Sequence, residues 1–346
     1  MRASPAPLVI LGVFLSTPTC VPAQSRQTGF LEKEVSFPVD ELQLAGALTL
    51  PNSQGRHPAV ILIPPATGMD RDRCSGEYCP FRDLAHGLAS RGIAVLRYDE
   101  RGSGSSTGEH VWQYPIQELR LDVLSAFELL AQRPEIDPGR IGLIGHSVGA
   151  AVVLPLAAAE LSELSAVVSL SGEAFPYAEM RTGYLRFLGT SSGKSDDAIA
   201  QAVRFEAEVV DPAAREGGDW AQIAEQLRAM AFSRSWDELT ISVGPTAFFR
   251  TVLDLDPRTL WHAVRCPALL VFGGADPLVE PEPNGRALLQ ALDESGNTQH
   301  AVRTVENMGH DLRNVAVSRQ TIAPDLIQAV SEWLASQFGL PVGTRE

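Results

Sequence analysis

The sequence predicts an α/β fold, with a mostly parallel eight-stranded sheet, helices on both faces and an inserted helical cap. Two observations lead to this prediction. Short, continuously apolar segments alternate with helix-period segments through most of the chain, which is typical of parallel strands covered by helices on both faces. Residues 175–263 interrupt this alternation, because they show helical periodicity and no buried strand.

The expected strands are of two kinds. Alternating apolar and polar residues predict a hairpin of strands 35–39 and 44–50 that turns at Asp40-Glu41, followed by a polar loop from Pro51 to Pro58. Five further strands are short, mainly apolar segments without alternation, at 59–63, 93–96, 141–144, 166–170 and 268–272, and a last strand is expected near 301–305. The helix-period segments between them favour parallel crossover connections.

Helices are expected where apolar residues recur at spacings of three and four. In the core they cover 81–89, 119–130, 148–160, 322–338 and a segment around Leu288. In the cap, Ser195 and Asp219 are expected to cap two helices, because a side-chain oxygen there can accept a free backbone N–H. The predicted organisation is a core of residues 24–174 and 264–346 around a cap of residues 175–263.

The role of the cap stays open at this point. It is either a substrate-facing lid, which we favour, or a packed structural subdomain. Its large apolar side chains could line a substrate pocket or pack the interior: Trp220, Met230, Phe248 and Phe249. The sequence does not choose between these.

The formal net charge of −14 excludes one class of function. Binding of nucleic acids needs a basic face, whereas this composition predicts an acidic surface. A share of 45% hydrophobic and 20% charged residues is typical of a soluble globular protein. No nucleic-acid partner is therefore expected.

Residues 1–23 are expected to be a cleaved signal peptide. Arg2 gives a positive start, residues 7–15 are apolar, and residues 21–23 offer a cleavage site. The apolar run is shorter than the ~20 residues of a transmembrane helix. The expected location is secreted or periplasmic, without stable membrane insertion of the mature chain. An uncleaved anchor, or lipidation at Cys20, is the alternative.

The other cysteines are Cys74, Cys79 and Cys266. In an oxidising compartment Cys74 and Cys79 could form a disulfide, and the sequence leaves this open. Cys266 precedes an apolar strand and is expected to pack as a small buried thiol. No cysteine or histidine spacing resembles a zinc site, so neither a metal nor a cofactor is expected.

The segment Gly145-x-Ser147-x-Gly149 has the pattern of a nucleophile elbow, a sharp turn that presents a serine between a strand and a helix. The strand expected at 141–144 and the helix expected at 148–160 supply this context. Glycine on both sides lets strand and helix approach without Cβ clashes, which an ordinary surface turn does not need. Ser147 is therefore the candidate nucleophile.

A serine hydroxyl needs a base, and an acid to orient that base. Asp276 and His310 each follow an expected strand, and sites in open α/β sheets form at the carboxyl ends of strands. The order Ser147, Asp276, His310 is the one expected of this architecture. Glu173 is the alternative acid, because it also follows a strand. The remaining histidines are expected at surface or packing positions: His57, His86, His110, His146, His262 and His300.

The oxyanion hole is expected to use two backbone N–H groups. One belongs to Val148, the residue after the nucleophile, and the other to the loop after the strand at 59–63. Pro64 and Pro65 have no N–H, so Ala66 is the first residue of that loop that can donate.

Two further loop segments lie near these positions in the sequence. Residues 70–73, Asp-Arg-Asp-Arg, could pair internally and hold their loop, or form a solvated charge run. Residues 99–105 are glycine-rich but lack the lysine of a phosphate loop and the pattern of a dinucleotide site. We expect the second segment to be a structural loop.

Several other motifs form one set. They are Pro80-Phe-Arg-Asp-Leu-Ala85, Gly92-Ile-Ala-Val-Leu-Arg-Tyr-Asp99, Arg101-Gly-x-Gly104, Phe249-Arg250, Asp256-Pro257, Arg265-Cys-Pro267, Gly274-x-Asp276, Gly309-His310 and Thr321-Ile-Ala-Pro324. Across nearly the whole mature chain this set resembles the alpha/beta-hydrolase superfamily, and more narrowly its secreted bacterial esterase and serine-aminopeptidase-like branch. The resemblance implies an alpha/beta-hydrolase fold and a serine hydrolase with Ser147, Asp276 and His310 as triad.

The expected chemistry is hydrolysis of a carboxylic ester in a small-molecule acyl substrate, through an acyl-serine. The same groups can serve a thioesterase, an acyltransferase or a peptidase, because the fold does not fix the acyl acceptor. A non-catalytic binding protein on this scaffold is the alternative from a different class.

Overall fold

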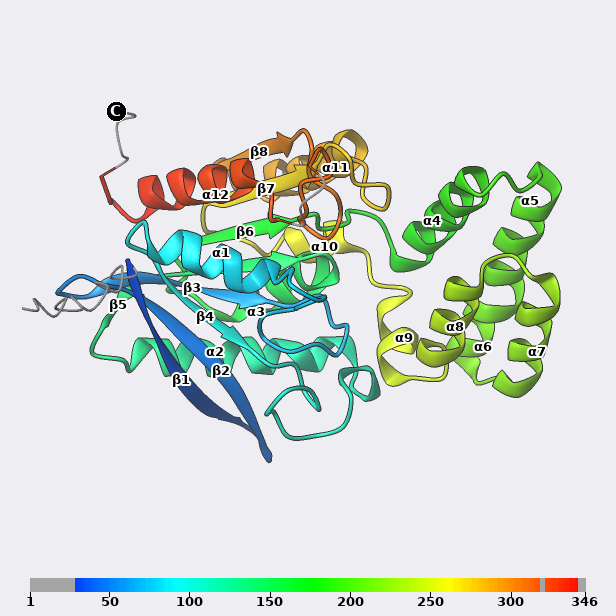
Figure 1. Ribbon diagram of the computed structural model, residues 1–346, viewed down its shortest axis with the longest axis horizontal. Helices are drawn as coiled ribbons and strands as arrows, with labels where there is room; N and C mark the ends of the chain where they lie inside the picture. The colour runs from blue at the N-terminus through cyan, green and yellow to red at the C-terminus, as the bar shows by residue number, and fades with distance from the viewer. Residues whose placement is uncertain (1–28, 318–320, 342–346) are drawn as a thin grey trace, which may run out of the picture.

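One eight-stranded sheet organises the computed structural model, which describes residues 29–317 and 321–341 (Figure 1). The strands are β1 (Phe30–Val39), β2 (Leu42–Pro51), β3 (His57–Ile63), β4 (Ala94–Tyr98), β5 (Ile136–His146), β6 (Ala166–Leu170), β7 (Ala268–Gly273) and β8 (His300–Val305). Their order in space is β1-β2-β4-β3-β5-β6-β7-β8, with β2 antiparallel to both neighbours and every other pair parallel. The mostly parallel eight-stranded sheet is confirmed, as is the hairpin turn at Asp40-Glu41.

Several strands are longer than the sequence indicated, and the extra residues at the starts of β1, β3 and β5 are largely polar. β1 begins at Phe30, but the residues that follow are exposed and largely charged, so the sequence shows no alternation there that would predict a strand. β3 begins at His57, whose N–H donates to Glu135 O at 2.8 Å, so the expected loop ends before Pro58. β5 begins at Ile136 and shifts register before its apolar part. Apolar runs mark only the strand segments that lie between two helix layers.

Helices cover both faces of the sheet, as predicted. One face packs against α1 (Pro80–Ala89) and α12 (Pro324–Gln337). The other packs against α2 (Arg120–Ala131), α3 (Leu154–Glu160), α10 (Pro257–Trp261) and α11 (Pro281–Glu294). Short 3-10 turns, Val111–Gln113 and Ile116–Leu119, precede α2, and a π-helical turn, Gly149–Val153, precedes α3.

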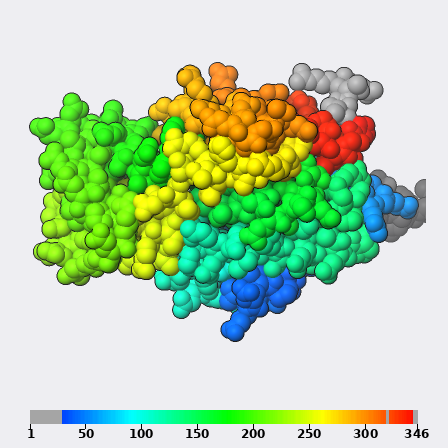
Figure 2. Space-filling model, turned by 180° about the vertical axis from the view of Figure 1, so that it is seen from behind, coloured from blue at the N-terminus to red at the C-terminus, as the bar shows by residue number. Residues whose placement is uncertain are grey.

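A set of helices between β6 and β7 forms a lobe beside the sheet (Figures 1 and 2). They are α4 (Tyr177–Ser191), α5 (Asp196–Phe205), α6 (Asp211–Glu216), α7 (Trp220–Met230), α8 (Arg234–Val243) and α9 (Ala247–Val252), with a π-helical turn (Glu206–Val210) between α5 and α6. The two predicted caps are confirmed. Ser195 accepts the N–H of Ala198, and Asp219 accepts those of Ala221 and Gln222.

A buried ion pair lies at the centre of this lobe. Arg181 Nη2 donates to Glu206 Oε2 at 2.8 Å and to Thr240 Oγ1 at 3.0 Å. The guanidinium lies between the rings of Trp236 and Phe249, 4.3 and 4.6 Å from their centroids. These contacts join α4, α8 and α9, so the lobe has an interior of its own.

The large apolar side chains of the cap, whose role the sequence left open, mostly pack in the interior. Phe248 and Phe249 are fully buried in the cluster that extends into the core, and Trp220 and Met230 pack partly buried against it. The predicted signal peptide, residues 1–23, lies outside the described residues. Within the described residues, none of the helices has the length and apolar character needed to cross a bilayer.

Candidate active site

Ser147 occupies a sharp turn between β5 and the π-helical turn that leads into α3. Its φ of 52° lies in the left-handed region, which a non-glycine residue rarely adopts. The strain is held from both sides: Ser147 N–H donates to Leu170 O at 2.9 Å, and Ser147 O accepts the N–H groups of Ala150 and Ala151. The turn therefore presents the hydroxyl at the carboxyl end of the sheet.

The two flanking glycines permit close backbone contacts on opposite sides of the turn. A Cβ at Gly145 would lie 2.7 Å from Ala150 Cα, and one at Gly149 would lie 2.2 Å from Pro64 O. Gly145 thus allows strand and helix to meet, as the sequence indicated. Gly149 in addition lets the loop after β3 reach the turn.

The expected base and acid lie beside this serine. His310 Nε2 is 3.0 Å from Ser147 Oγ, and His310 Nδ1 is 2.9 Å from Asp276 Oδ2. The second oxygen of Asp276 accepts the N–H groups of Leu278 and Val279, so the fully buried carboxylate is fixed in its loop. The structure thus brings all three predicted residues together in one hydrogen-bonded row.

Glu173, the alternative acid, lies close to the row but outside it. It makes no hydrogen bond to His310, and its Oε2 has no partner among the described residues. Burial raises the pKa of this carboxyl to about 7, with the charge of Asp276 adding to the rise and His310 opposing it. Asp276 therefore orients the imidazole in this structure, and Glu173 is a second buried acid next to it.

The two N–H groups expected for an oxyanion are both available. Neither Val148 N nor Ala66 N has a hydrogen-bond acceptor in the described part of the chain. Ala66 has a left-handed φ of 55°, and its carbonyl accepts Trp112 Nε1–H at 2.8 Å. Its N–H is thus held in one orientation, as a preorganised donor must be.

Glu100 is a residue of this site that the sequence did not identify. Its carboxylate accepts Met69 N–H at 2.8 Å and Thr67 N–H at 3.1 Å, directly after Ala66. Burial raises its pKa to about 7, and the backbone N–H groups oppose that rise. Glu100 comes from the glycine-rich loop expected to be structural, and it fixes the loop that carries Ala66.

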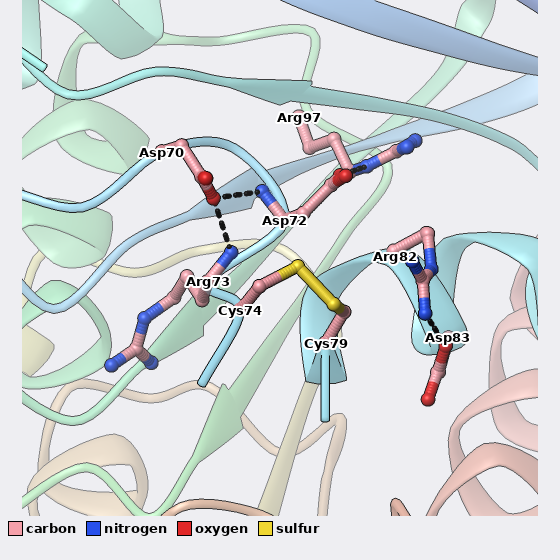
Figure 3. The surroundings of a disulfide bond; sticks show 8 residues. All are labelled: Asp70, Asp72, Arg73, Cys74, Cys79, Arg82, Asp83 and Arg97. Atoms are coloured by element: carbon pink, nitrogen blue, oxygen red, sulfur yellow. Dashed lines mark hydrogen bonds and ion pairs between the residues drawn. A yellow bond between two sulfur atoms is a disulfide. The ribbon is translucent and has the colours of Figure 1, made fainter. Parts of the chain in front are cut away.

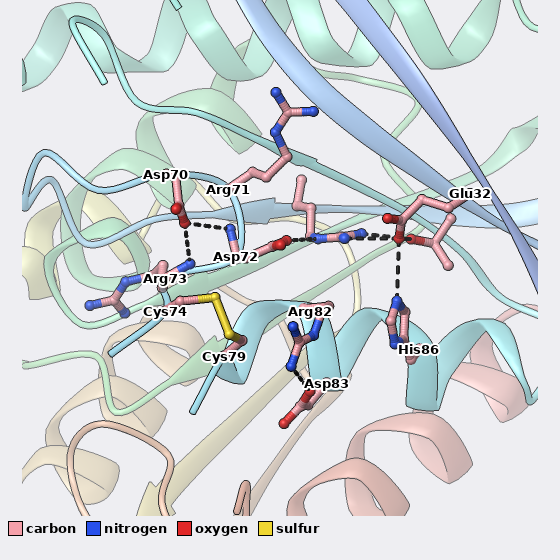
Figure 4. Close-up of polar contacts among 12 residues, drawn as sticks. Glu32, Asp70, Arg71, Asp72, Arg73, Cys74, Cys79, Arg82, Asp83 and His86 are labelled. Atoms are coloured by element: carbon pink, nitrogen blue, oxygen red, sulfur yellow. Dashed lines mark hydrogen bonds and ion pairs between the residues drawn. A yellow bond between two sulfur atoms is a disulfide. The ribbon is translucent and has the colours of Figure 1, made fainter. Parts of the chain in front are cut away.

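The charged run 70–73 is held partly from within, as one of the two interpretations expected, because Asp70 Oδ1 accepts the N–H groups of Asp72 and Arg73 at 3.0 and 2.8 Å. Its other side chains pair with segments outside the run. Arg71 binds Asp99 with two hydrogen bonds, at 2.9 and 2.8 Å. Asp72 accepts a hydrogen bond from Arg97 Nε at 2.7 Å, and Arg97 Nη2 donates to Glu32 Oε2 of β1 at 2.8 Å. Asp72 and Glu32 are labelled in Figure 4. The run is thus tied to the antiparallel edge of the sheet.

The cysteines have a definite arrangement. Cys74 and Cys79 form a disulfide at the start of α1, which answers the question left open by their spacing (Figure 3). Cys266 is only partly buried, and burial raises the pKa of its thiol to about 11. Among the described residues, no cluster of three or more histidine, cysteine or acidic side chains could hold a metal ion.

A cavity of about 630 Å³ lies between α4 and the loop after β7. Asp276, one member of the hydrogen-bonded row, and Glu173 both line it. Its apolar walls include Phe175, Met180 and Phe187, from the segment that enters α4 and from α4 itself. These side chains were not singled out in the sequence, because an apolar helix face has the same pattern whether it lines a cavity or packs in the protein interior.

A model of the family described as serine aminopeptidase, S33, matches residues 74–314, a span that contains Ser147, Asp276 and His310. The chain belongs to this family. Esterase EstD of Thermotoga maritima is 28% identical to it over 233 residues, which are 67% of this chain and 50% of EstD. The chain therefore spans about half the length of this curated relative.

Solved structures show the same alpha/beta-hydrolase fold. An esterase of Pyrococcus furiosus has a TM-score of 0.57 at 18% identity, covering 91% of this chain and 92% of that one. The alpha/beta hydrolase GrgF of a Penicillium species also has a TM-score of 0.57, at 19% identity, covering 90% of this chain and all of its own. The fold expected from the sequence is confirmed.

Proposed function

We propose that this chain is a serine hydrolase that cleaves carboxylic esters of small-molecule acyl substrates through an acyl-serine. The observation that carries the proposal is the hydrogen-bonded row Ser147–His310–Asp276, with Oγ–Nε2 and Nδ1–Oδ2 distances of 3.0 and 2.9 Å. The similarity to the esterase EstD supports the same chemistry.

In the first half of the reaction, His310 Nε2 accepts the proton of Ser147 Oγ while that oxygen attacks the ester carbonyl carbon. Asp276 holds Nδ1–H and favours the imidazolium that forms. The N–H groups of Val148 and Ala66 donate to the oxyanion of the tetrahedral intermediate. His310 then gives its proton to the departing alkoxide, and the acyl group stays on Ser147.

In the second half, water takes the place of the alcohol. His310 removes a proton from the water, and the hydroxide attacks the acyl-serine carbonyl. The same two N–H groups donate to the second oxyanion. Collapse of this intermediate returns the proton to Ser147 Oγ and releases the carboxylic acid. The steps require no group outside the chain, substrate and water.

A second candidate is cleavage of an amide, since the family is described as serine aminopeptidase. Thioester cleavage and acyl transfer need the same groups. The kcat/KM values for a panel of matched p-nitrophenyl esters, thioesters and aminoacyl anilides rank these classes of acyl donor. Higher kcat/KM for esters is the expected result, and faster aminoacyl anilide cleavage would favour the peptidase.

The catalytic proposal is tested at Ser147. Ser147→Ala should lower kcat on a p-nitrophenyl ester by on the order of a million-fold, because the row acts as a unit. A fluorophosphonate probe should label the unmodified protein and leave the variant unlabelled. Wild-type protein that neither reacts with the probe nor turns over any acyl substrate would favour a non-catalytic binding protein.

A further inference from the structure

The loop that carries His310 is held from outside the triad by two hydrogen bonds to consecutive carbonyl groups. His146 Nε2 lies 2.7 Å from His310 O, and Tyr78 Oη donates to Asp311 O at 2.7 Å. Both partners are buried, with 2% of each residue exposed. The backbone on which the imidazole hangs is therefore fixed by side chains from two other segments.

The first of these side chains depends on Arg73. Arg73 Nη1 lies 2.8 Å from His146 Nδ1. Because a guanidinium has no acceptor, Nδ1 must be the acceptor, so the ring proton is on Nε2 and donates to His310 O. Burial, together with the charge of Arg73, keeps the pKa of His146 well below its ordinary value, so the ring is neutral. The direction of both hydrogen bonds is thus set.

The second side chain, Tyr78, belongs to the loop closed by the disulfide. Ser75 and Tyr78 exchange two backbone hydrogen bonds, and Cys74 and Cys79 lie just outside this pair. The guanidinium of Arg313 lies 4.7 Å from the centre of the tyrosine ring and thereby adds a contact on the histidine side.

The disulfide also fixes the Arg73 side of this arrangement. Arg73 has a left-handed φ of 54°, and its N–H donates to Asp70 (Figure 3). Its guanidinium lies 5.3 Å from the ring centre of Phe81 in α1. Cys74 directly follows Arg73, and Cys79 directly precedes α1. The bond therefore ties the segment that carries Arg73 to the helix against which Arg73 packs.

We propose that the disulfide-closed loop, residues 74–79, is a clamp on the histidine loop, with Arg73, His146 and Tyr78 as positioning residues for the reaction. This inference rests on the proposed function. Opening the disulfide frees both flanks of the clamp at once, and His310 loses its fixed distance to Ser147. Misplacement of a catalytic group by about 1 Å can cost on the order of a hundredfold in rate.

Reduction provides the direct test, because Cys74 is partly exposed. A trialkylphosphine cleaves the Sγ–Sγ bond: the phosphorus is oxidised by two electrons and takes oxygen from water, and the two sulfurs gain those electrons and two protons to become thiols. Unlike a thiol reductant, the phosphine does not itself add a thiol that cleaves the ester. Alkylation of Cys74 and Cys79 followed by mass spectrometry verifies complete reduction.

The assay uses the Cys266→Ser protein, so that Cys74 and Cys79 are the only cysteines left among the described residues. Phosphine should lower kcat about tenfold or more, with KM changed less than about twofold, and reoxidation should restore kcat. A fully reduced protein with unchanged kcat would overturn the clamp. Absence of fluorophosphonate labelling in the oxidised protein would instead overturn the proposed function.

Point variants separate positioning from stability. Tyr78→Phe keeps the ring and removes only the hydroxyl, and should lower kcat about threefold to tenfold at unchanged KM. Arg73→Lys retains an N–H donor for His146 Nδ1, whereas Arg73→Met retains none. The loss of kcat in Arg73→Lys should therefore be less than about half of the loss in Arg73→Met. All are measured well below their melting temperatures. If Tyr78→Phe and Arg73→Met lower only the melting temperature, the role is structural and the clamp is wrong.

Discussion

Ser147 lies between two walls that are built differently. On the core wall, the loops at 64–79 and 99–101 hold each other through buried polar contacts, of which the Glu100 bonds to Thr67 and Met69 are an example. On the cap wall, between α4 and the loop after β7, Glu173 lines a cavity of about 630 Å³, and its Oε2 has no partner in the described chain.

The difference is clearest in the two glutamates. Burial raises the pKa of both Glu100 and Glu173 to about 7. Glu100 recovers part of the cost of burial by accepting backbone N–H groups, whereas the carboxyl of Glu173 accepts, within the described residues, only its own N–H. A satisfied group makes its loop rigid, and an unsatisfied group leaves a position that a ligand can satisfy. Under the proposed function, the core wall would therefore serve the chemistry and the cap wall the recognition of substrate.

The largest loss of kcat is expected on substitution of Asp276, which would separate its role in the reaction from that of Glu173. Asp276→Asn keeps an oxygen for the N–H groups of Leu278 and Val279, but turns an amide NH₂ toward His310 Nδ1. The imidazole then adopts the wrong tautomer, and kcat should fall about 10⁴-fold. The measurement is ester turnover near neutral pH, with unfolding curves to show that the fold is kept. A loss below tenfold would mean that another acid orients His310.

The next effect is expected at Glu100, on the core wall. Glu100→Gln leaves one acceptor oxygen for N–H groups that now use two, so the loop that carries Ala66 loosens. Removal of one oxyanion donor costs about 10²- to 10³-fold in kcat, so a loosened donor should cost about tenfold. KM should change little, because the donor acts on the oxyanion.

The matched control for Glu100→Gln is Glu118→Gln. Glu118 is half exposed and approaches Arg101, the residue after Glu100, at 3.7 Å. Among the described residues, no hydrogen bond or ion pair joins its side chain to the loop of Ala66, so kcat should stay within about twofold of wild type. If both variants lowered kcat equally, the charge of this region rather than the hydrogen bonds of Glu100 would be responsible.

The sequence predicted the parts of this site that follow from local pattern and chain direction. Ser147 lies in a five-residue turn motif, Asp276 follows a buried strand and His310 follows the next parallel strand, so parallel pairing alone brings them to one edge. Strand ends were less well predicted at Phe30 and His57, because polar residues lie there outside the helix layers.

The supporting residues could not be predicted in this way. Glu100 is 33 residues from Thr67, and His146 is 164 residues from the carbonyl it contacts. Such pairs depend on loop conformation at the sheet edge, which no periodicity encodes. For His146 the sequence showed only that it directly precedes Ser147 in the turn motif. Its side chain cannot readily act as the base for its neighbour, but this position does not indicate another role. The disulfide likewise depended on how a short loop folds.

Among the residues of the two walls, Glu173 is expected to have the smallest effect on turnover, and its substitution mainly changes stability. Its pKa rises from 4.5 to about 7 on folding, which corresponds to roughly 3 kcal/mol. The folded state therefore binds this proton more tightly, so the contribution to stability is complete below pH 4.5 and is lost as the pH rises through 7. Glu173→Gln removes the titration and should keep kcat within about threefold, since His310 is bonded to Asp276 instead.

Denaturant unfolding of wild type and Glu173→Gln at pH 4 and pH 8 measures the effect. The free energy of unfolding of wild type should fall relative to the variant by up to about 3 kcal/mol between these values, whatever the offset at pH 4. The carboxyl of Glu100 titrates in both proteins and cancels in the difference. A difference that stays constant with pH would mean that Glu173 has a partner or solvent access when folded, and the two walls would then be alike. A kcat loss as large as that of Asp276→Asn would place Glu173 with the chemistry instead of with the cavity.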